Sequence, residues 1–324
     1  MRLILASLIG AATLLGMSAS HAETYPEKPV TIVVPYSAGG PVDIFTRALG
    51  QGLSSRWGKP VIVVNRPGAN EIIGADSVAK SKPDGYTLFA GTEASLTMSP
   101  HLYTKLPYNV QADFVPISHA ISLPLVFFVS NKVQANTMKE FVEQAKRQKD
   151  PPFSYGSTGA GGIAHLPMVT LEKQEGISMT HVPYRGASNL IPDVISGEID
   201  AAVLGVSVIE QHIKKGSVKA LAFSAAQRSA ALPDVPTFSE AGVTDINAVF
   251  NIGLVAPKGT PSDIVEKIAK DVREVIHEPK FRKTNIDDFS YVAVGSSPSE
   301  FGQFLIENSK MQAKRISDAG VTLN

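Results

Sequence analysis

Two glycine-rich segments are the parts of the sequence best suited to binding chemistry. The first contains Tyr36, Ser37, Ala38, Gly39 and Gly40 and ends at Asp43; the second runs from Gly156 to Gly162, with Ser157, Gly159 and Gly161, and leads to His165. Each follows a predicted strand and precedes a predicted helix, so several backbone N–H groups there lack an intrahelical partner. Their partial positive charge, reinforced by the helix dipole, favours an anion. Either segment alone could be a simple tight turn, because glycine is the commonest turn residue; two together indicate an anion held between them.

Three side chains near these segments have a functional and a structural interpretation. His165 could reach a ligand from the first helical turn, or could pack there as a half-buried histidine. Asp43 could satisfy the helix dipole and could also order the glycine loop by accepting bonds from its N–H groups. Tyr36 could form a wall of a pocket or cover the edge of the core.

Motifs of common enzymes are missing from the sequence. A phosphate-binding loop needs a lysine after its glycines, and neither segment has one. A serine-hydrolase elbow needs Gly-x-Ser-x-Gly, whereas Ser157 directly follows Gly156. The seven histidines have no metal-binding spacing. We therefore expect no metal, no cofactor and no catalytic residue; the enzyme alternative is a secreted hydrolase that uses Ser157 and His165.

The elements that position these segments alternate between strand and helix, which predicts an α/β fold with mainly parallel sheets. No Gly/Ser-rich linker divides the chain, so two lobes joined by crossing strands at 117–128 and 248–255 are expected. Lobe 1 would comprise 23–122 and 248–324, and lobe 2 would comprise 123–247. The predicted strands are 30–34, 61–64, 86–90, 153–155, 179–183, 201–204, 218–223 and 252–255; the predicted helices are 41–57, 71–81, 137–149, 164–175, 187–196 and two long C-terminal helices.

The N-terminus and the composition indicate where the protein works. Arg2, an apolar run from Leu3 to Met17, and small residues at Ser20 and Ala22 predict a signal peptide over 1–22. A transmembrane anchor would need ~20 apolar residues. The absence of cysteine suits the bacterial periplasm. Thirty basic residues balance thirty acidic ones, which argues against a nucleic-acid partner.

Many segments along the mature chain resemble the Bug family of extracytoplasmic solute receptors, the binding components of tripartite tricarboxylate transporters. The resemblance implies a non-enzymatic, type II-like Venus flytrap that closes on a small carboxylate: a dicarboxylate, a tricarboxylate, an aromatic acid or an acidic amino acid. We expect a monomer whose closed form docks on a membrane transporter or serves a sensor or an enzyme system instead. The matching segments include Tyr25-Pro26-Glu27-Lys28-Pro29, Val64-Asn65-Arg66-Pro67-Gly68, Pro83-Asp84-Gly85-Tyr86-Thr87, His181-Val182-Pro183-Tyr184-Arg185-Gly186 and Gly253-Leu254-Val255-Ala256-Pro257.

The resemblance also implies which residues meet the ligand. They are Tyr36 to Gly40, Asp43 and Thr92 in lobe 1, and Ser157, Gly159, Gly161 and His165 in lobe 2.

The chain departs from the family pattern at four places. Leu204 and Gly205 stand where an acid is frequent, which weakens the case for an amino-acid ligand; Gly205 still belongs to the candidate set. Glu93 could supply a partner for an ammonium group instead, or could be a solvent-exposed loop acid. Asn70-Glu71 and Asn251 also differ from the pattern, and neither place is expected to touch a ligand. A secreted interaction protein with an empty cleft remains the third alternative.

Overall fold

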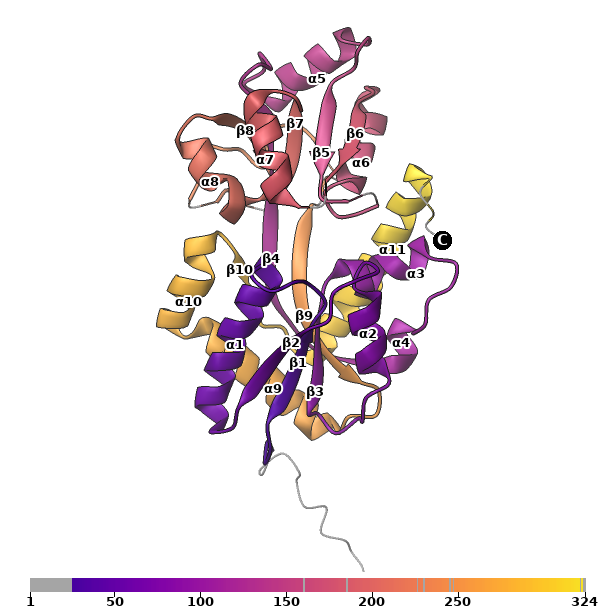
Figure 1. Ribbon diagram of the computed structural model, residues 1–324, viewed down its shortest axis with the longest axis vertical. Coiled ribbons are helices and arrows are strands. Elements are labelled where there is room, and N and C mark those ends of the chain that lie inside the picture. Colours follow the sequence, from indigo (N-terminus) through magenta and orange to yellow (C-terminus); the bar gives the residue numbers. More distant parts are fainter. Residues whose placement is uncertain are drawn as a thin grey trace, which may run out of the picture.

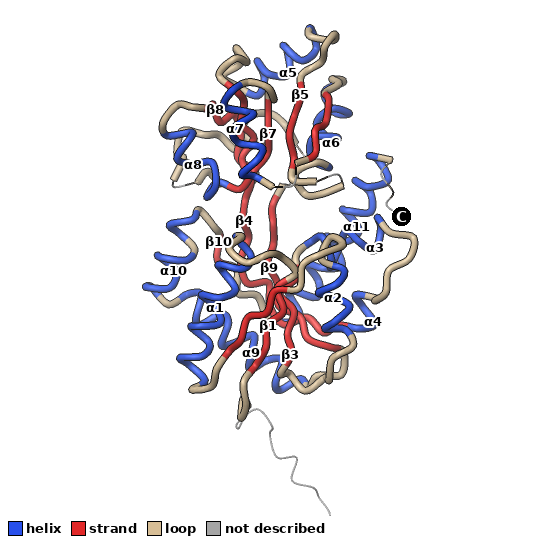
Figure 2. Tube along the Cα trace, in the orientation of Figure 1, coloured by secondary structure: helices blue, strands red, loops and turns tan. Residues whose placement is uncertain are grey.

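The computed structural model describes residues 25–320 and Thr322, except residues 160, 185, 226, 230, 245 and 247. The predicted signal peptide over 1–22 lies outside the described residues. The described chain folds into two α/β lobes connected by two long strands, as the sequence predicts (Figure 1). Helices lie on both faces of the strands in each lobe (Figure 2).

In lobe 1, three parallel strands run toward lobe 2. β1 lies between β2 and β3, with Val30 beside Val61 and Val33 beside Phe89. Because parallel strands end at the same edge of a sheet, the loops after β1, β2 and β3 gather on the side that faces lobe 2 (Figure 1). The elements of this first part are β1 (Val30–Val34), α1 (Pro41–Trp57), β2 (Val61–Asn65), α2 (Ile72–Ala79), β3 (Thr87–Gly91), η1 (Ala94–Met98), α3 (Ser99–Leu102) and α4 (Val110–Asp113).

In lobe 2, the parallel strands run the opposite way, toward lobe 1. β5 lies between β7 and β6, with Tyr155 beside both Ala201 and His181. Their carboxyl ends therefore face the loops of lobe 1 (Figure 1). The elements are α5 (Met138–Arg147), β5 (Ser154–Ser157), α6 (Leu166–Glu175), β6 (Thr180–Pro183), α7 (Ala187–Ser196), β7 (Ala201–Gly205), α8 (Val206–Lys214) and β8 (Val218–Phe223).

Two antiparallel strands, β4 (Phe114–Ser130) and β9 (Val249–Pro257), cross between the lobes. β3 ends where Gly91 lies beside Gly253 of β9, which in turn lies beside His119 of β4. β7 ends where Gly205 lies beside Leu125 of β4. At ~3.3 Å per residue, the ends of β3 and β7 are separated by roughly 20 Å of β4. The pairing register thus places the carboxyl ends of β3 in lobe 1 and of β7 in lobe 2 at opposite ends of one short stretch of β4.

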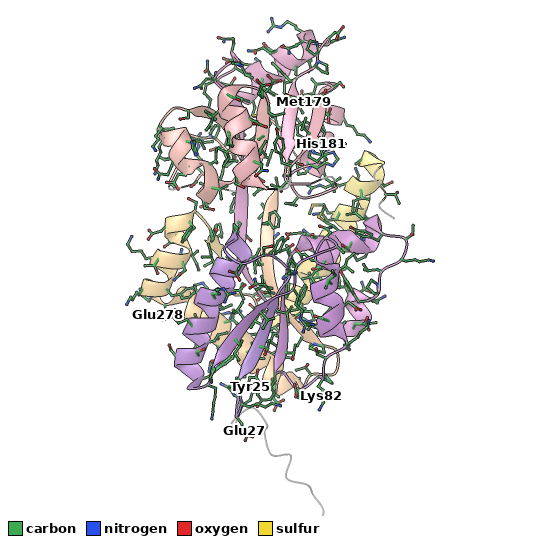
Figure 3. The ribbon with its side chains drawn as sticks, viewed as in Figure 1. Tyr25, Glu27, Lys82, Met179, His181 and Glu278 are labelled. Carbon is green, nitrogen blue, oxygen red and sulfur yellow. The ribbon has the colours of Figure 1, made fainter. Side chains whose placement is uncertain are left out.

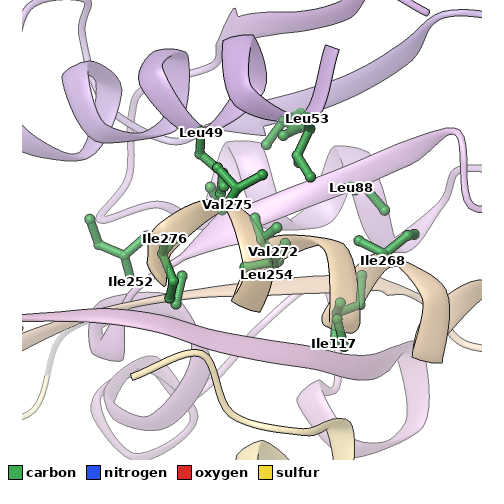
Figure 4. Close-up of a cluster of buried hydrophobic side chains, with 14 of the residues drawn as sticks. Leu49, Leu53, Leu88, Ile117, Ile252, Leu254, Ile268, Val272, Val275 and Ile276 are labelled. Atoms are coloured by element: carbon green, nitrogen blue, oxygen red, sulfur yellow. The ribbon is translucent and has the colours of Figure 1, made fainter. Parts of the chain in front are cut away.

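Alternate residues of the lobe 1 strands pack against two different helical layers. Ile32, Leu88 and Leu254 join the core under α1 and α9 (Ser262–His277). Their neighbours Val33, Phe89 and Val255 join a second core on the opposite face, with α2 and α11 (Pro298–Ala319). Figure 4 shows the first core, where α9 lies against α1 and the strands; its labelled side chains are Leu49, Leu53, Leu88, Ile117, Ile252, Leu254, Ile268, Val272, Val275 and Ile276.

The C-terminal part returns to lobe 1 and ends in the two predicted long helices. Between α9 and α11 lie three short elements: α10 (Pro279–Asn285), η2 (Asp287–Phe289) and β10 (Val292–Ala293). α11 also reaches lobe 2, because its Ile316 packs in one apolar cluster with Leu166 of α6 and Met98 of η1. In the part of the chain that the structure describes, no helix has the length and apolar character to cross a membrane.

Candidate ligand-binding site

Asp43 organises the glycine-rich loop between β1 and α1. Its buried carboxylate accepts hydrogen bonds from the Gly39 N–H (2.9 Å), from Arg47 Nε (3.0 Å) and from Asn65 Nδ2 (2.7 Å). Burial raises the pKa of Asp43, but these bonds and the Arg47 charge outweigh burial and hold the pKa below its ordinary value. Gly39 has φ 85°, which glycine adopts without strain. The loop-ordering role predicted for Asp43 is confirmed.

Glu71 is buried beside this loop and contacts its residue Tyr36. Its carboxylate, 2% exposed, accepts hydrogen bonds from the hydroxyls of Tyr36, Thr92 and Ser95 and from the Thr92 N–H. Burial raises the pKa of Glu71 above its ordinary value. Glu71 therefore holds two predicted site residues, Tyr36 and Thr92, against each other, although it was not itself expected to touch a ligand.

Glu93 is buried at the end of β3, with 3% exposure. It accepts hydrogen bonds from the N–H of Asn251 (3.0 Å) and from the Asn251 side-chain amide. Burial raises the pKa of Glu93 to about 8. The alternative of a solvent-exposed loop acid is thus wrong, and Asn251 of β9 contacts this predicted site residue directly.

In the second glycine-rich loop, two histidines stack beside Ser157. The rings of His165 and His181 lie 4.0 Å apart, centroid to centroid, and Ser157 Oγ lies 2.7 Å from His181 Nε2. The Gly161 N–H donates to His165 Nδ1 (2.9 Å) and the Gly159 N–H donates to Ser157 Oγ (3.2 Å). Burial, together with the neighbouring His181, lowers the pKa of His165 to about 4. His165 is therefore neutral at neutral pH and serves as an acceptor that shapes the loop.

These contacts correct two expectations about the glycine-rich loops: that His165 would be the partner of Ser157, and that the N–H groups of the loop glycines would be unpaired. The imidazole that meets Ser157 belongs to His181, which lies in lobe 2 (Figure 3), and not to His165. The N–H groups of Gly39, Gly159 and Gly161 already have partners within their own loops. They shape the loops, so an anion would have to use the remaining polar groups of these loops.

The predicted residues fall into two groups on facing sides of the lobes. In lobe 1, Tyr36 and Thr92 meet on Glu71, and Asn65 joins Tyr36 to Asp43, whereas Glu93 bonds Asn251 instead. In lobe 2, Ser157, Gly159, Gly161 and His165 are connected through His181. Ser37, Ala38 and Gly39 are exposed, and Gly40 is half-buried. Gly205 ends β7 beside Leu125, at the point where β4 enters lobe 2.

A separate cavity of about 550 Å³ lies in lobe 1 between the segment 96–116 and α11, lined in part by His101, Tyr108 and Lys258. It includes none of the predicted site residues. Among residues 25–320, outside the gaps named above, no group of three His, Asp or Glu side chains could hold a metal ion.

Three contributors to the site were missed in the sequence: Glu71, His181 and Asn251. Of these three, only His181 could have been predicted from the sequence, because its strand is parallel to and beside the strand that carries Tyr155 and Ser157. Glu71 and Asn251 contact residues 21 and 158 positions away, respectively. Only the tertiary register brings such pairs together.

Comparison with known proteins agrees with this architecture. Residues 45–321 match the family described as "Tripartite tricarboxylate transporter family receptor". The chain is 29% identical to the protein BugT of Bordetella pertussis over 306 residues, covering 93% of this chain and 92% of BugT. Two solved structures are also similar. A protein of R. palustris with adipate has a TM-score of 0.81 and 25% identity, covering 92% of this chain and 99% of that one.

The second structure, MatC from Rhodopseudomonas palustris with bound malate, has a TM-score of 0.77 and 26% identity, covering 90% of this chain and 100% of MatC. Members of the family are periplasmic solute-binding proteins rather than enzymes. The chain belongs to the tripartite tricarboxylate transporter receptor family, in its Bug branch.

Proposed function

We propose that this protein is a periplasmic receptor that captures a small carboxylate between the loops that end β1 and β3 in lobe 1 and β5 and β7 in lobe 2. One observation carries the proposal. The register of β4 and β9 sets the ends of parallel strands from two lobes against each other, and a glycine-rich loop that leads into a helix lies on each side. Ligands of open α/β sheets bind at such strand ends, and two similar proteins were solved with malate and with adipate.

The ordered loops support capture without chemical change. Asp43 and Glu71 hold the groups of lobe 1, and His165 and His181 hold those of lobe 2, through hydrogen bonds within each lobe. A preorganised site gains affinity because little freedom is lost on binding. Bending of β4 and β9 would close the lobes and replace the water around the carboxylate by fixed polar groups.

Several features of this proposal rest on the sequence. The signal peptide over 1–22 would direct the chain to the periplasm, and the lobes would divide at 122/123 and 247/248. A membrane transporter of the tripartite class or a sensor would receive the loaded receptor, which would act as a monomer.

A thermal-shift screen of the mature chain from Glu23 tests the proposal, because a ligand that binds only the folded state raises the melting temperature. The probes are malate, adipate, citrate, benzoate and aspartate. At a concentration about 100 times its dissociation constant, a ligand adds about 2.7 kcal/mol to the free energy of unfolding. Stabilisation by at least one probe is expected. No stabilisation by any carboxylate would favour an interaction protein, and hydrolysis of simple esters would favour the hydrolase alternative.

A further inference from the structure

The two lobes touch at two places away from the crossing strands β4 and β9. The first contact is apolar and is called the α6–α11 cluster below. Leu166, the first residue of α6 in lobe 2, packs there with Met98 of η1, Leu102 of α3 and Ile316 of α11, which all belong to lobe 1. None of these four side chains is more than 4% exposed. The end of α11 therefore extends beyond lobe 1 and is buried against lobe 2 (Figure 1).

The second contact is polar and lies on the other side of the crossing strands, on the side of α8 and α10 (Figure 2). Ser207 Oγ of α8 lies 3.4 Å from the Tyr291 hydroxyl, and Ser229 Oγ donates to Ser290 Oγ (3.1 Å). Ser290 and Tyr291 lie between η2 and β10 in lobe 1, whereas Ser207 and Ser229 belong to lobe 2. An apolar contact thus joins the lobes on one side, and two pairs of hydroxyl groups join them on the other.

These two contacts respond differently when the lobes move. Separating the α6–α11 cluster would return four buried side chains to water, which is unfavourable in proportion to the apolar area exposed. Apolar packing has no preferred direction, so the cluster tolerates a rotation of α6 against α11. A pair of hydroxyl groups, by contrast, exchanges its hydrogen bond for bonds to water at little net cost. We therefore expect the apolar contact to persist while the polar contact opens and closes.

Lobe 2 is built to turn as one body, and the crossing strands are built to bend. Both faces of the lobe 2 sheet are covered by packed cores, since Phe127 belongs to the core on one face and Phe128 to the core on the other. The pairing of β4 with β9 shifts its register at 116–118 and again at 119–121. Such irregularities bend a strand locally. Bending at the crossing therefore moves the whole of lobe 2.

We infer that the α6–α11 cluster is a pivot: it positions the second glycine-rich loop against lobe 1, and lobe 2 closes by turning about it. The inference rests on the proposed function for the role of the loops, and it adds which half of the site moves. Leu166 directly follows His165, so the loop 157–165 lies next to the pivot and shifts little. Gly205, which leads into α8, lies on the far side and travels further toward the guest (Figure 2).

Distances between pairs of nitroxide labels, measured by pulsed EPR in the ligand-free mature chain, test this inference. The chain has no cysteine, so the labels attach only to introduced ones. The first pair joins α6 to α11 on the pivot side, and the second pair joins α8 to α10 on the opposite side. The positions, all exposed, are Gln174→Cys with Lys310→Cys and Gln211→Cys with Thr284→Cys. The distance distribution of the second pair should be at least about twofold wider than that of the first, because a body that turns about one point moves most at its far end.

Substitutions on α11 separate a pivot from ordinary packing. Ile316→Asp places a charge in the α6–α11 cluster and should widen the first distribution until it matches the second. Ile306→Asp makes the same change on the same helix at a position that is 43% exposed, so this control should leave both distributions unchanged. Ile316→Ala is milder; it should widen the first distribution in part, and it carries the test if Ile316→Asp does not fold. Melting curves show which variants are folded.

Two results would overturn the inference. One is an equal width of the two distributions in the intact protein, whether both are narrow or both are wide. The other is a first distribution that stays narrow in every folded variant of Ile316. Either result, together with stabilisation by a carboxylate in the thermal-shift screen, would leave the proposed function standing. The expected distributions without any thermal shift would overturn the proposed function and leave the pivot.

Discussion

Replacement of Glu71 by alanine should destabilise lobe 1 and loosen the site at the same time. Four hydrogen bonds end on this carboxylate, and their donors lie on β1–α1, on the end of β3 and on η1. After Glu71→Ala, the hydroxyls of Tyr36 and Thr92, 3.3 Å apart, can still bond to each other. The Thr92 N–H loses its acceptor, and the Ser95 hydroxyl keeps only a long contact of 3.5 Å to the Thr92 carbonyl.

The size of the effect follows from these two donors. Each buried donor without a partner costs about 1–3 kcal/mol. The gross loss is therefore about 2–6 kcal/mol, and part of it is recovered because a costly buried acid is removed. We expect a net loss of about 2–4 kcal/mol in the free energy of unfolding. Glu71→Gln should cost less than about 1 kcal/mol, since its carbonyl accepts from the Thr92 N–H and the hydroxyls can rotate to accept from its amide.

Urea denaturation followed by tryptophan fluorescence measures this loss. The single tryptophan, Trp57, lies at the end of α1 and donates to Asp271 of α9 (2.7 Å), so its signal reports on lobe 1. Glu143→Ala, at an exposed position of α5, is the control and should change stability by less than about 0.5 kcal/mol. Equal losses in Glu71→Ala and Glu71→Gln, or a loss below about 1 kcal/mol in Glu71→Ala, would refute the role assigned to Glu71.

Three further predictions concern the second loop and the crossing strands. Gly161→Val should abolish ligand-induced thermal shifts without unfolding the protein. Valine disfavours the φ of 72° that Gly161 adopts, so the loop would change shape where the Gly161 N–H donates to His165. Unchanged affinity would show that this loop does not hold the ligand. The pKa of His165 lies at about 4, below its ordinary 6.5, so the stability that it contributes is complete above pH 6.5 and is lost as the pH falls through 4. His165→Asn, which keeps an acceptor but does not titrate, should flatten this part of the stability profile; an unchanged profile would assign the acid sensitivity elsewhere, His181 first. Gly253→Ala should cost about 1–3 kcal/mol, because a Cβ there would lie 2.1 Å from the Phe301 ring; Phe301→Leu in the same chain should recover part of this loss in urea denaturation, and additive losses would contradict the clash.

Most of the fold was predictable because its strands are short apolar runs between strongly helical patterns. The helix 41–57 and the strand 30–34 have the predicted bounds, and β4 and β9 are the two crossing strands expected at 117–128 and 248–255. α8 was missed because Val206 starts the helix directly after Gly205 ends the strand, with no turn residues between them. α10 is a short helix that follows α9 after a single residue, Glu278, which leaves equally little local signal.

The site was predictable only in part. Glycines mark both loops because positive φ at Gly39 and Gly161 requires them, and this signal is local. The groups that fix these loops are not local: Glu71 reaches Thr92, and Asn251 reaches Glu93 across the sheet. An acid such as Glu93 reads as an ordinary loop residue until the register of β3 and β9 shows that it is buried.

A crystal structure of the mature chain with the carboxylate that gives the largest thermal shift tests the central claim most directly. We predict that the carboxylate lies between the loop 35–40 of lobe 1 and the loop 157–165 of lobe 2. A ligand in the cavity beside His101 and Lys258, or two loops that face away from each other around an empty space, would contradict it.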